Sequence, residues 1–200
     1  LIVLGGIGFF VWDDIAKNQW HFRNYTLQTK VVLTTTALLL ILPFLWFWLC
    51  EFVHWNGMST GKQALSALFQ TVSPRTAGFN NVDLNQLSGG SKLLTILLML
   101  VGGSPSSTAG GIKTTTLAIL LLALRAAFTS DHQVHCFGRR IPAQVITRTL
   151  VVSVLYGTLF LVASMALIQL EPVTMEEALF ECASAIGTVG LSIGGTARFS

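Results

Sequence analysis

The stretch GKQALSALFQTVSPRTAGFN, residues Gly61–Asn80, decides the fold of this chain. Its first part predicts a short helix over Lys62–Val72. Pro74 ends that helix, because the residue before a proline is pushed away from the α region. Four uncharged residues follow, Thr76-Ala77-Gly78-Phe79. The C-terminal end of a helix carries roughly half a negative charge, and a glycine-containing extended run beyond it can turn carbonyl oxygens toward a cation. The stretch therefore predicts a pore loop with an ion filter.

The same plan returns near the end of the chain. Residues Thr174–Ser192 predict a second short helix, which is followed by Thr188-Val189-Gly190-Leu191. Both tetrapeptides read threonine, small or branched apolar residue, glycine, large apolar residue. Each helix also opens on a capping-box pattern, Thr60-x-x-Gln63 in the first copy and Thr174-x-x-Glu177 in the second. An internal repeat is a more specific signal than either copy alone, so we interpret the two stretches as equivalent pore loops.

The composition is that of a membrane protein. Hydrophobic residues make up 52% of the chain, charged residues only 10%, and the mean hydropathy is +0.67; soluble domains are usually about 25% charged. The net charge of +3 is small and its basic residues lie in loops, so no nucleic-acid partner is expected. The three cysteines are widely spaced and show no metal or disulfide pattern.

Two uninterrupted apolar runs predict membrane-spanning helices. Val31–Cys50 has no charged residue and is long enough to cross a hydrocarbon core of about 30 Å. Pro43 is expected to kink it. Val145–Gln169 is the second clear span, and it ends at Glu171-Pro172. The apolar opening, residues 1–11, is interpreted as the end of an earlier helix and 12–30 as a polar linker, so the chain is expected to be an interior piece of a larger membrane protein.

A third apolar region is interrupted. Leu93–Val101 and Thr114–Leu124 are compatible with helices, but Gly102–Lys113, GGSPSSTAGGIK, separates them. Its glycines and proline break the helix at membrane depth. Irregular backbone is tolerated there only where protein or water satisfies its polar groups, so we expect this segment to face an aqueous path.

The basic residues predict the orientation. Seven of the twelve lysines and arginines lie in the two loops 12–30 and 125–148, which the positive-inside rule makes cytoplasmic. Both pore loops and most acids then lie on the opposite face, where an acidic outer mouth would concentrate cations. The expected mouth residues are Glu51, Asp83, Glu171, Glu176, Glu177 and Glu181.

Together, TAGFN, GTVGLS and the intervening GGSPSSTAGGIKTTT resemble the Trk/Ktr/HKT superfamily of potassium transporters, closest to the Ktr-type bacterial membrane subunit. The resemblance covers essentially the whole chain. It implies an all-α membrane protein of repeated transmembrane helix, pore loop, transmembrane helix units around a central ion pore. It divides the chain into the end of a second repeat (1–11), a cytoplasmic linker (12–30), a third repeat (31–124, with pore loop 60–80 and gate loop 102–113), a cytoplasmic loop (125–147) and half of a fourth repeat (148–200, with pore loop 174–192).

The resemblance also implies roles for residues. Backbone carbonyls of Thr76, Ala77, Gly78, Phe79, Thr188, Val189, Gly190 and Leu191 would coordinate K⁺, with their side chains packed behind the filter. The gate would be formed by Gly102, Gly103, Ser104, Pro105, Gly110, Gly111 and Lys113. K⁺ is the expected cargo, with Na⁺ dependence as in Ktr-type relatives. Expected partners are a second full-length subunit, a cytosolic nucleotide-binding ring and the lipid bilayer of the cell membrane, for which a bacterial inner membrane is expected.

Two charged residues near these motifs have competing interpretations. Arg75 precedes the first filter tetrapeptide and is expected to pair with an outer acid such as Glu181, although it could instead repel or position ions. Lys113 is the only charge between Lys92 and Arg125. It is expected to face the pore and block or gate it, the alternative being a helix-end lysine that reaches the inner interface.

Other function classes have less support. A secondary transporter of a small anionic solute could also use broken helices, but the N-termini of its half-helices would face the substrate. An enzyme in the membrane would need ionisable pairs within the spans, so no enzymatic activity is expected. The run Gly110–Thr114 resembles a phosphate-binding loop only superficially, because Ile112 stands where that motif needs glycine.

Overall fold

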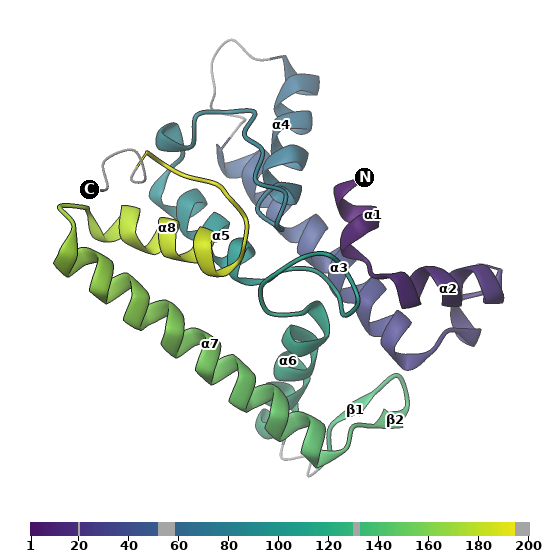
Figure 1. Cartoon of the computed structure of the whole chain (residues 1–200). Helices are drawn as coiled ribbons and strands as arrows, with labels where there is room; N and C mark the ends of the chain where they lie inside the picture. Colours follow the sequence, from purple (N-terminus) through teal and green to yellow (C-terminus); the bar gives the residue numbers. More distant parts are fainter. Residues whose placement is uncertain (20, 52–58, 130–132, 195–200) are drawn as a thin grey trace.

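The chain folds as an irregular bundle of helices (Figure 1). The computed structural model describes residues 1–19, 21–51, 59–129 and 133–194. The helices are α1 (Ile2–Gly6), α2 (Phe9–Asn18), α3 (Leu27–Trp46), α4 (Thr60–Val72), α5 (Gly89–Leu100), α6 (Thr114–Phe128), α7 (Ala143–Leu170) and α8 (Met175–Ile186), with short 3₁₀ turns at Phe22–Asn24 and Leu84–Gln86. The expectation of a mostly helical protein is confirmed.

Two helices are long and apolar enough to cross a membrane, as the sequence predicts. The first combines α3 with a π-helical turn, Phe47–Glu51, into one segment of 25 residues, Leu27–Glu51. Pro43 lies inside α3 and lacks a backbone N–H, and the π turn follows one helical turn later. The second is α7, 28 residues long. Most of the large side chains on α7 are exposed, which suits contact with lipid.

The N-terminal part differs from the expectation of a helix tail followed by a loop. The chain turns at Gly8, whose φ is 92°, and α2 then occupies much of the presumed linker. The Asp14 carboxylate on α2 accepts hydrogen bonds from the backbone N–H (2.9 Å) and hydroxyl (2.9 Å) of Thr26, just before α3. Burial raises the pKa of Asp14, but hydrogen bonds from Thr29, Thr26 and Asn18 outweigh it and hold the pKa below its usual value. The described part of segment 12–30 therefore includes an ordered corner between α2 and α3.

The two helices predicted to be pore helices, α4 and α8, end where the sequence predicts, but only one starts as predicted. The capping box at Thr174 and Glu177 is present at the start of α8. In α4, however, Ser59 is the N-cap residue and makes no side-chain capping bond, so the capping box expected at Thr60 is wrong. The chain turns already at Ser59, which leaves Thr60 inside the first turn.

A small hairpin lies between α6 and α7, in the segment that was predicted only as a cytoplasmic loop. Strands β1 (His135–Cys136) and β2 (Arg139–Arg140) pair antiparallel, with His135 opposite Arg140. The two turn residues Phe137 and Gly138 both have positive φ, the conformation of a tight two-residue hairpin turn. This hairpin is a local departure from the all-helical expectation.

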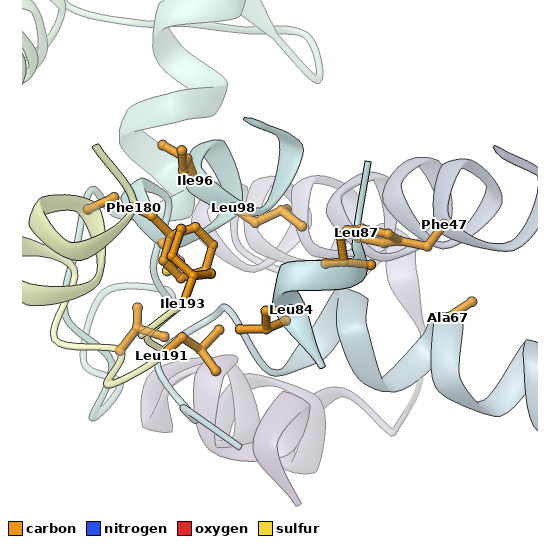
Figure 2. Close-up of a cluster of buried hydrophobic side chains, with 12 residues drawn as sticks. Phe47, Ala67, Leu84, Leu87, Ile96, Leu98, Phe180, Leu191 and Ile193 are labelled. Atoms are coloured by element: carbon orange, nitrogen blue, oxygen red, sulfur yellow. The ribbon is translucent and has the colours of Figure 1, made fainter. Parts of the chain in front are cut away.

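A hydrophobic core lies between α3, α4, α5 and α8 (Figure 2). Phe47, Met99 and Phe180 are fully buried in it. Val189 and Leu191 from the chain after α8 belong to the same core, 6% and 2% exposed. The core therefore packs against one side of the second predicted filter tetrapeptide, through the side chains of Val189 and Leu191.

Candidate functional site: two pore loops and a glycine-rich loop

The two tetrapeptides, here called filter segments 1 (Thr76–Phe79) and 2 (Thr188–Leu191), share one backbone conformation. In each, the threonine and the glycine have positive φ: 64° at Thr76, 73° at Gly78, 55° at Thr188 and 91° at Gly190. The residue between them does not. Such alternation turns successive carbonyl groups toward one side of the chain, whereas an extended strand points them to opposite sides. The repeat seen in the sequence is thus a repeat of structure.

A serine hydroxyl fixes each filter segment from the end of its pore helix. Ser73 Oγ accepts a hydrogen bond from the backbone N–H of Phe79 (2.9 Å) and donates to the Phe79 carbonyl. Ser184 Oγ accepts from the backbone N–H of Gly190 (3.1 Å). In both loops the serine reaches the residue six positions later. The sequence analysis missed these serines, although a serine close to the end of both pore helices was a visible part of the repeat.

The two filter segments meet. A Cβ atom added to Gly78 would lie 2.1 Å from the Val189 carbonyl oxygen and 3.5 Å from the Gly190 Cα. Because α4 and α8 end directly before these segments, the C-termini of both pore helices approach the same place. The partial negative charge of a helix C-terminus favours a cation there.

The residues of the two filter segments differ in how deeply they are buried. Val189 and Leu191 pack in the core, as expected, while Thr188 and Gly190 are exposed. Thr76, Ala77 and Gly78 are half-buried. Phe79 is 64% exposed, so the expectation that its side chain packs behind the filter is wrong. Its backbone is instead fixed through the Ser73 hydroxyl.

The interruption between α5 and α6 is an ordered loop. Gly102–Lys113, here called the glycine-rich loop, is closed at its base by backbone hydrogen bonds from Gly102 N to the Ile112 carbonyl (3.0 Å) and from Ile112 N to the Leu100 carbonyl (3.0 Å). The Thr114 N–H also donates to the Gly103 carbonyl (3.1 Å). Gly102, Gly103 and Ser104 are buried, Pro105, Gly110, Gly111 and Lys113 are half-buried, and only Ser106 and Thr108 are exposed.

The glycine-rich loop packs against filter segment 2 and against the start of the chain. A Cβ atom at Gly110 would lie 2.1 Å from Thr188 Oγ1. At the other side, Ser104 N donates to the Gly6 carbonyl (2.8 Å) and Phe9 N to the Ser106 carbonyl (3.2 Å). Figure 1 shows this loop near the centre of the molecule, between α5, α6 and the turn from α1 to α2.

The two charged residues differ from their expected contacts. Arg75 is 7% exposed and donates through Nη2 to the Gly102 carbonyl (3.4 Å); among the described residues it makes no ion pair, so the expected bridge to Glu181 is wrong. Glu181 instead accepts from Ser192 Oγ (2.6 Å) and Ile193 N (3.2 Å). Lys113 Nζ donates to the Ala109 carbonyl (2.6 Å) within the glycine-rich loop.

Two of the six acids that were expected at an outer mouth are buried. Glu51 is 6% exposed and accepts hydrogen bonds from Ser88 N (3.0 Å), Ser88 Oγ (2.7 Å) and Ser91 Oγ (2.6 Å) at the start of α5. Glu181 is also 6% exposed and holds the chain after filter segment 2. Both carboxylates organise backbone, which is the common use of a buried acid.

Comparison with known proteins identifies the family. A family of cation transport proteins, TrkH, matches residues 1–200. The chain belongs to this family. The Ktr system potassium uptake protein B of Vibrio alginolyticus is 38% identical over 100% of the chain, and the potassium/sodium uptake protein NtpJ of Enterococcus hirae is 40% identical over 97% of it. The chain spans only 45% and 44% of these relatives. The resemblance to the Trk/Ktr potassium transporters is confirmed, and the TrkH family is one of membrane cation transporters and not of enzymes.

A solved structure of the TrkH family shares the fold. The crystal structure of the potassium transporter TrkH from Vibrio parahaemolyticus superimposes with a TM-score of 0.79 over 94% of the chain and 42% of that protein, at 21% identity. At this identity the likeness concerns the fold alone. It supports the mostly helical fold of this chain.

Proposed function

We propose that the chain is part of a subunit that conducts K⁺ into the cell through a carbonyl-lined filter. The observation that carries this is the contact between Gly78 and Val189, in two segments with the same alternating backbone. Their carbonyls, with those of two further repeats outside this chain, replace the water shell of K⁺. The names of the relatives, potassium uptake and potassium/sodium uptake proteins, support the cargo.

The glycine-rich loop acts in this proposal as the gate below the filter. Its contact with Thr188 connects it to filter segment 2, and its small residues let backbone approach backbone. Lys113 donates a hydrogen bond to the Ala109 carbonyl and so stabilises the conformation of the gate loop. In this proposal it does not act as a free charge that blocks the pore. The full subunit is proposed to form a homodimer in the bacterial inner membrane, to pass the membrane several times, to bind a cytosolic nucleotide-binding ring, and to couple uptake to Na⁺.

Transport of an anionic solute is the less favoured function. It would need helix N-termini directed at the substrate, whereas α4 and α8 bring their C-termini together. Chloride or phosphate uptake in place of K⁺ uptake by the purified full-length protein would support it.

The filter is tested by Gly78→Ser in the full-length protein, expressed in bacteria that lack their own K⁺ uptake. The added side chain meets the Val189 carbonyl and is strained at φ 73°, so the K⁺ preference over Na⁺ should fall. Gly61→Ser, in the first turn of the preceding helix α4, is the matched control, since a Cβ there meets nothing within 4 Å. Unchanged Na⁺ competition in Gly78→Ser would remove the filter assignment.

A further inference from the structure

Arg75 is a buried cation with few partners. The guanidinium group has five N–H donors, yet one hydrogen bond, to the Gly102 carbonyl, is made and the buried Nε has no partner among the described residues. The adjoining hollow, lined by Val72, Arg75, Gly103 and residues of α1, has a volume of about 10 Å³. That is about the lower limit for one water molecule, so this hollow offers the guanidinium little room for solvent.

The position of Arg75 explains how its charge is tolerated. It lies three residues after the end of α4, and its partner Gly102 lies two residues after the end of α5. The carbonyl groups at both helix C-termini carry partial negative charge. Arg75 therefore lies just after the C-terminal end of α4, which leads to filter segment 1, and its guanidinium donates to a carbonyl just after the C-terminal end of α5, which leads to the glycine-rich loop.

Both residues of the contact, Arg75 and Gly102, are held by surrounding backbone. Arg75 N donates to the Val72 carbonyl (3.2 Å), and Arg75 directly precedes Thr76 of filter segment 1. Gly102 is closed in by the loop base, where a Cβ would lie 1.6 Å from the Gly110 carbonyl oxygen. A shift of the glycine-rich loop at this point must therefore break or stretch the contact with Arg75.

We propose that Arg75 is a positioning residue that ties the base of the glycine-rich loop to filter segment 1 and holds the loop across the ion path. The proposal rests on the proposed function of these two segments. It predicts that loss of the guanidinium frees the loop and raises K⁺ flux, while the filter carbonyls keep their K⁺ preference.

The experiment compares Arg75→Gln, Arg75→Lys and the control Lys92→Gln in the full-length protein in bacteria that lack other K⁺ uptake. Lys92 is also a partly buried cation, but its partner is Glu176 (2.6 Å). K⁺ uptake rate, Na⁺ competition and the amount of protein in the membrane are measured. Arg75→Gln should raise uptake about fivefold, the lower end of typical coupling between sites, with unchanged Na⁺ competition. Arg75→Lys, which keeps the charge, and Lys92→Gln should stay near the wild-type rate.

Three results would overturn the proposal. A wild-type K⁺ uptake rate in Arg75→Gln would mean that the contact with Gly102 does not restrain the glycine-rich loop. A loss of K⁺ preference over Na⁺ in this variant would mean that Arg75 acts on the filter itself. If Arg75→Gln is depleted from the membrane, Arg75→Met is measured, because its unbranched apolar side chain occupies similar space without a hydrogen-bond donor. Depletion of both variants would mean that Arg75 is needed for folding. The proposed function fails separately, if the wild-type protein takes up no K⁺ or Gly78→Ser leaves Na⁺ competition unchanged.

Discussion

Gly110 of the glycine-rich loop lies directly against Thr188 of filter segment 2. A Cβ atom at position 110 would come within 2.1 Å of Thr188 Oγ1 and 2.8 Å of the Gly187 carbonyl oxygen. The proposed gate therefore touches the proposed filter directly, through the Thr188 side chain and the Gly187 carbonyl. These two residues lie far apart in the sequence.

Gly110→Ala should therefore disturb filter segment 2. We expect K⁺ uptake to fall about tenfold, equivalent to about 1.4 kcal/mol. The double variant Gly110→Ala with Thr188→Ala removes the nearest clashing atom and should recover part of the rate, giving a non-additive cycle. Gly157→Ala on α7 is the control, since nothing lies within 4 Å of a Cβ there. Additive losses in the double variant would contradict the contact.

Shortening the glycine-rich loop should raise K⁺ flux if the loop obstructs the path. Deletion of residues 106–108 removes its exposed tip and the Ser106 carbonyl that binds Phe9 N, but leaves the base hydrogen bonds of Gly102 and Ile112 in place. Initial rates of K⁺ uptake into proteoliposomes containing the full-length protein provide the measurement. A rate equal to that of the wild type would remove the gating role of the loop.

Glu51→Ala should lower stability and leave selectivity unchanged. The buried carboxylate accepts three hydrogen bonds from Ser88 and Ser91, so its removal leaves donors unsatisfied at a cost of about 1–3 kcal/mol. Thermal unfolding of the detergent-solubilised protein measures this loss. Glu176→Ala, which breaks the ion pair with Lys92 at a half-exposed carboxylate, should cost at most about 1 kcal/mol. A change in ion selectivity in Glu51→Ala, with wild-type stability, would instead support the predicted role of Glu51 at the pore mouth.

Thr174→Ala should destabilise the start of α8, whereas Thr60→Ala should not affect α4. The Thr174 hydroxyl accepts a hydrogen bond from the Glu177 N–H, and the Thr174 N–H donates to the Glu177 carboxylate (2.9 Å). Loss of such a cap costs about 1 kcal/mol. Thr60 lies after the N-cap residue Ser59 and has no such role. The same unfolding assay compares the two variants, and equal effects would contradict the difference between the two pore helices.

Much of the fold follows from local sequence. Runs of apolar residues define α3 and α7, Pro74 ends α4, and the glycines and proline of the glycine-rich loop separate α5 from α6, because these signals act on neighbouring backbone. The repeat of threonine and glycine also predicted two equivalent segments. Their common positive φ values agree with that prediction, since glycine adopts this conformation at little cost.

Only the tertiary structure decided which residues are partners. The sequence predicted a pairing of Arg75 with an outer acid such as Glu181, but the folded chain brings Arg75 to the Gly102 carbonyl. Glu51 and Glu181 instead accept hydrogen bonds from serine hydroxyls and backbone N–H groups. A buried charged group binds whichever oppositely polarised group lies near it, and which backbone carbonyl comes near depends on tertiary packing that a sequence pattern does not encode. The sequence alone determined the helices, their breaks and the repeat; the packing decided that the two filter segments and the glycine-rich loop meet at one place.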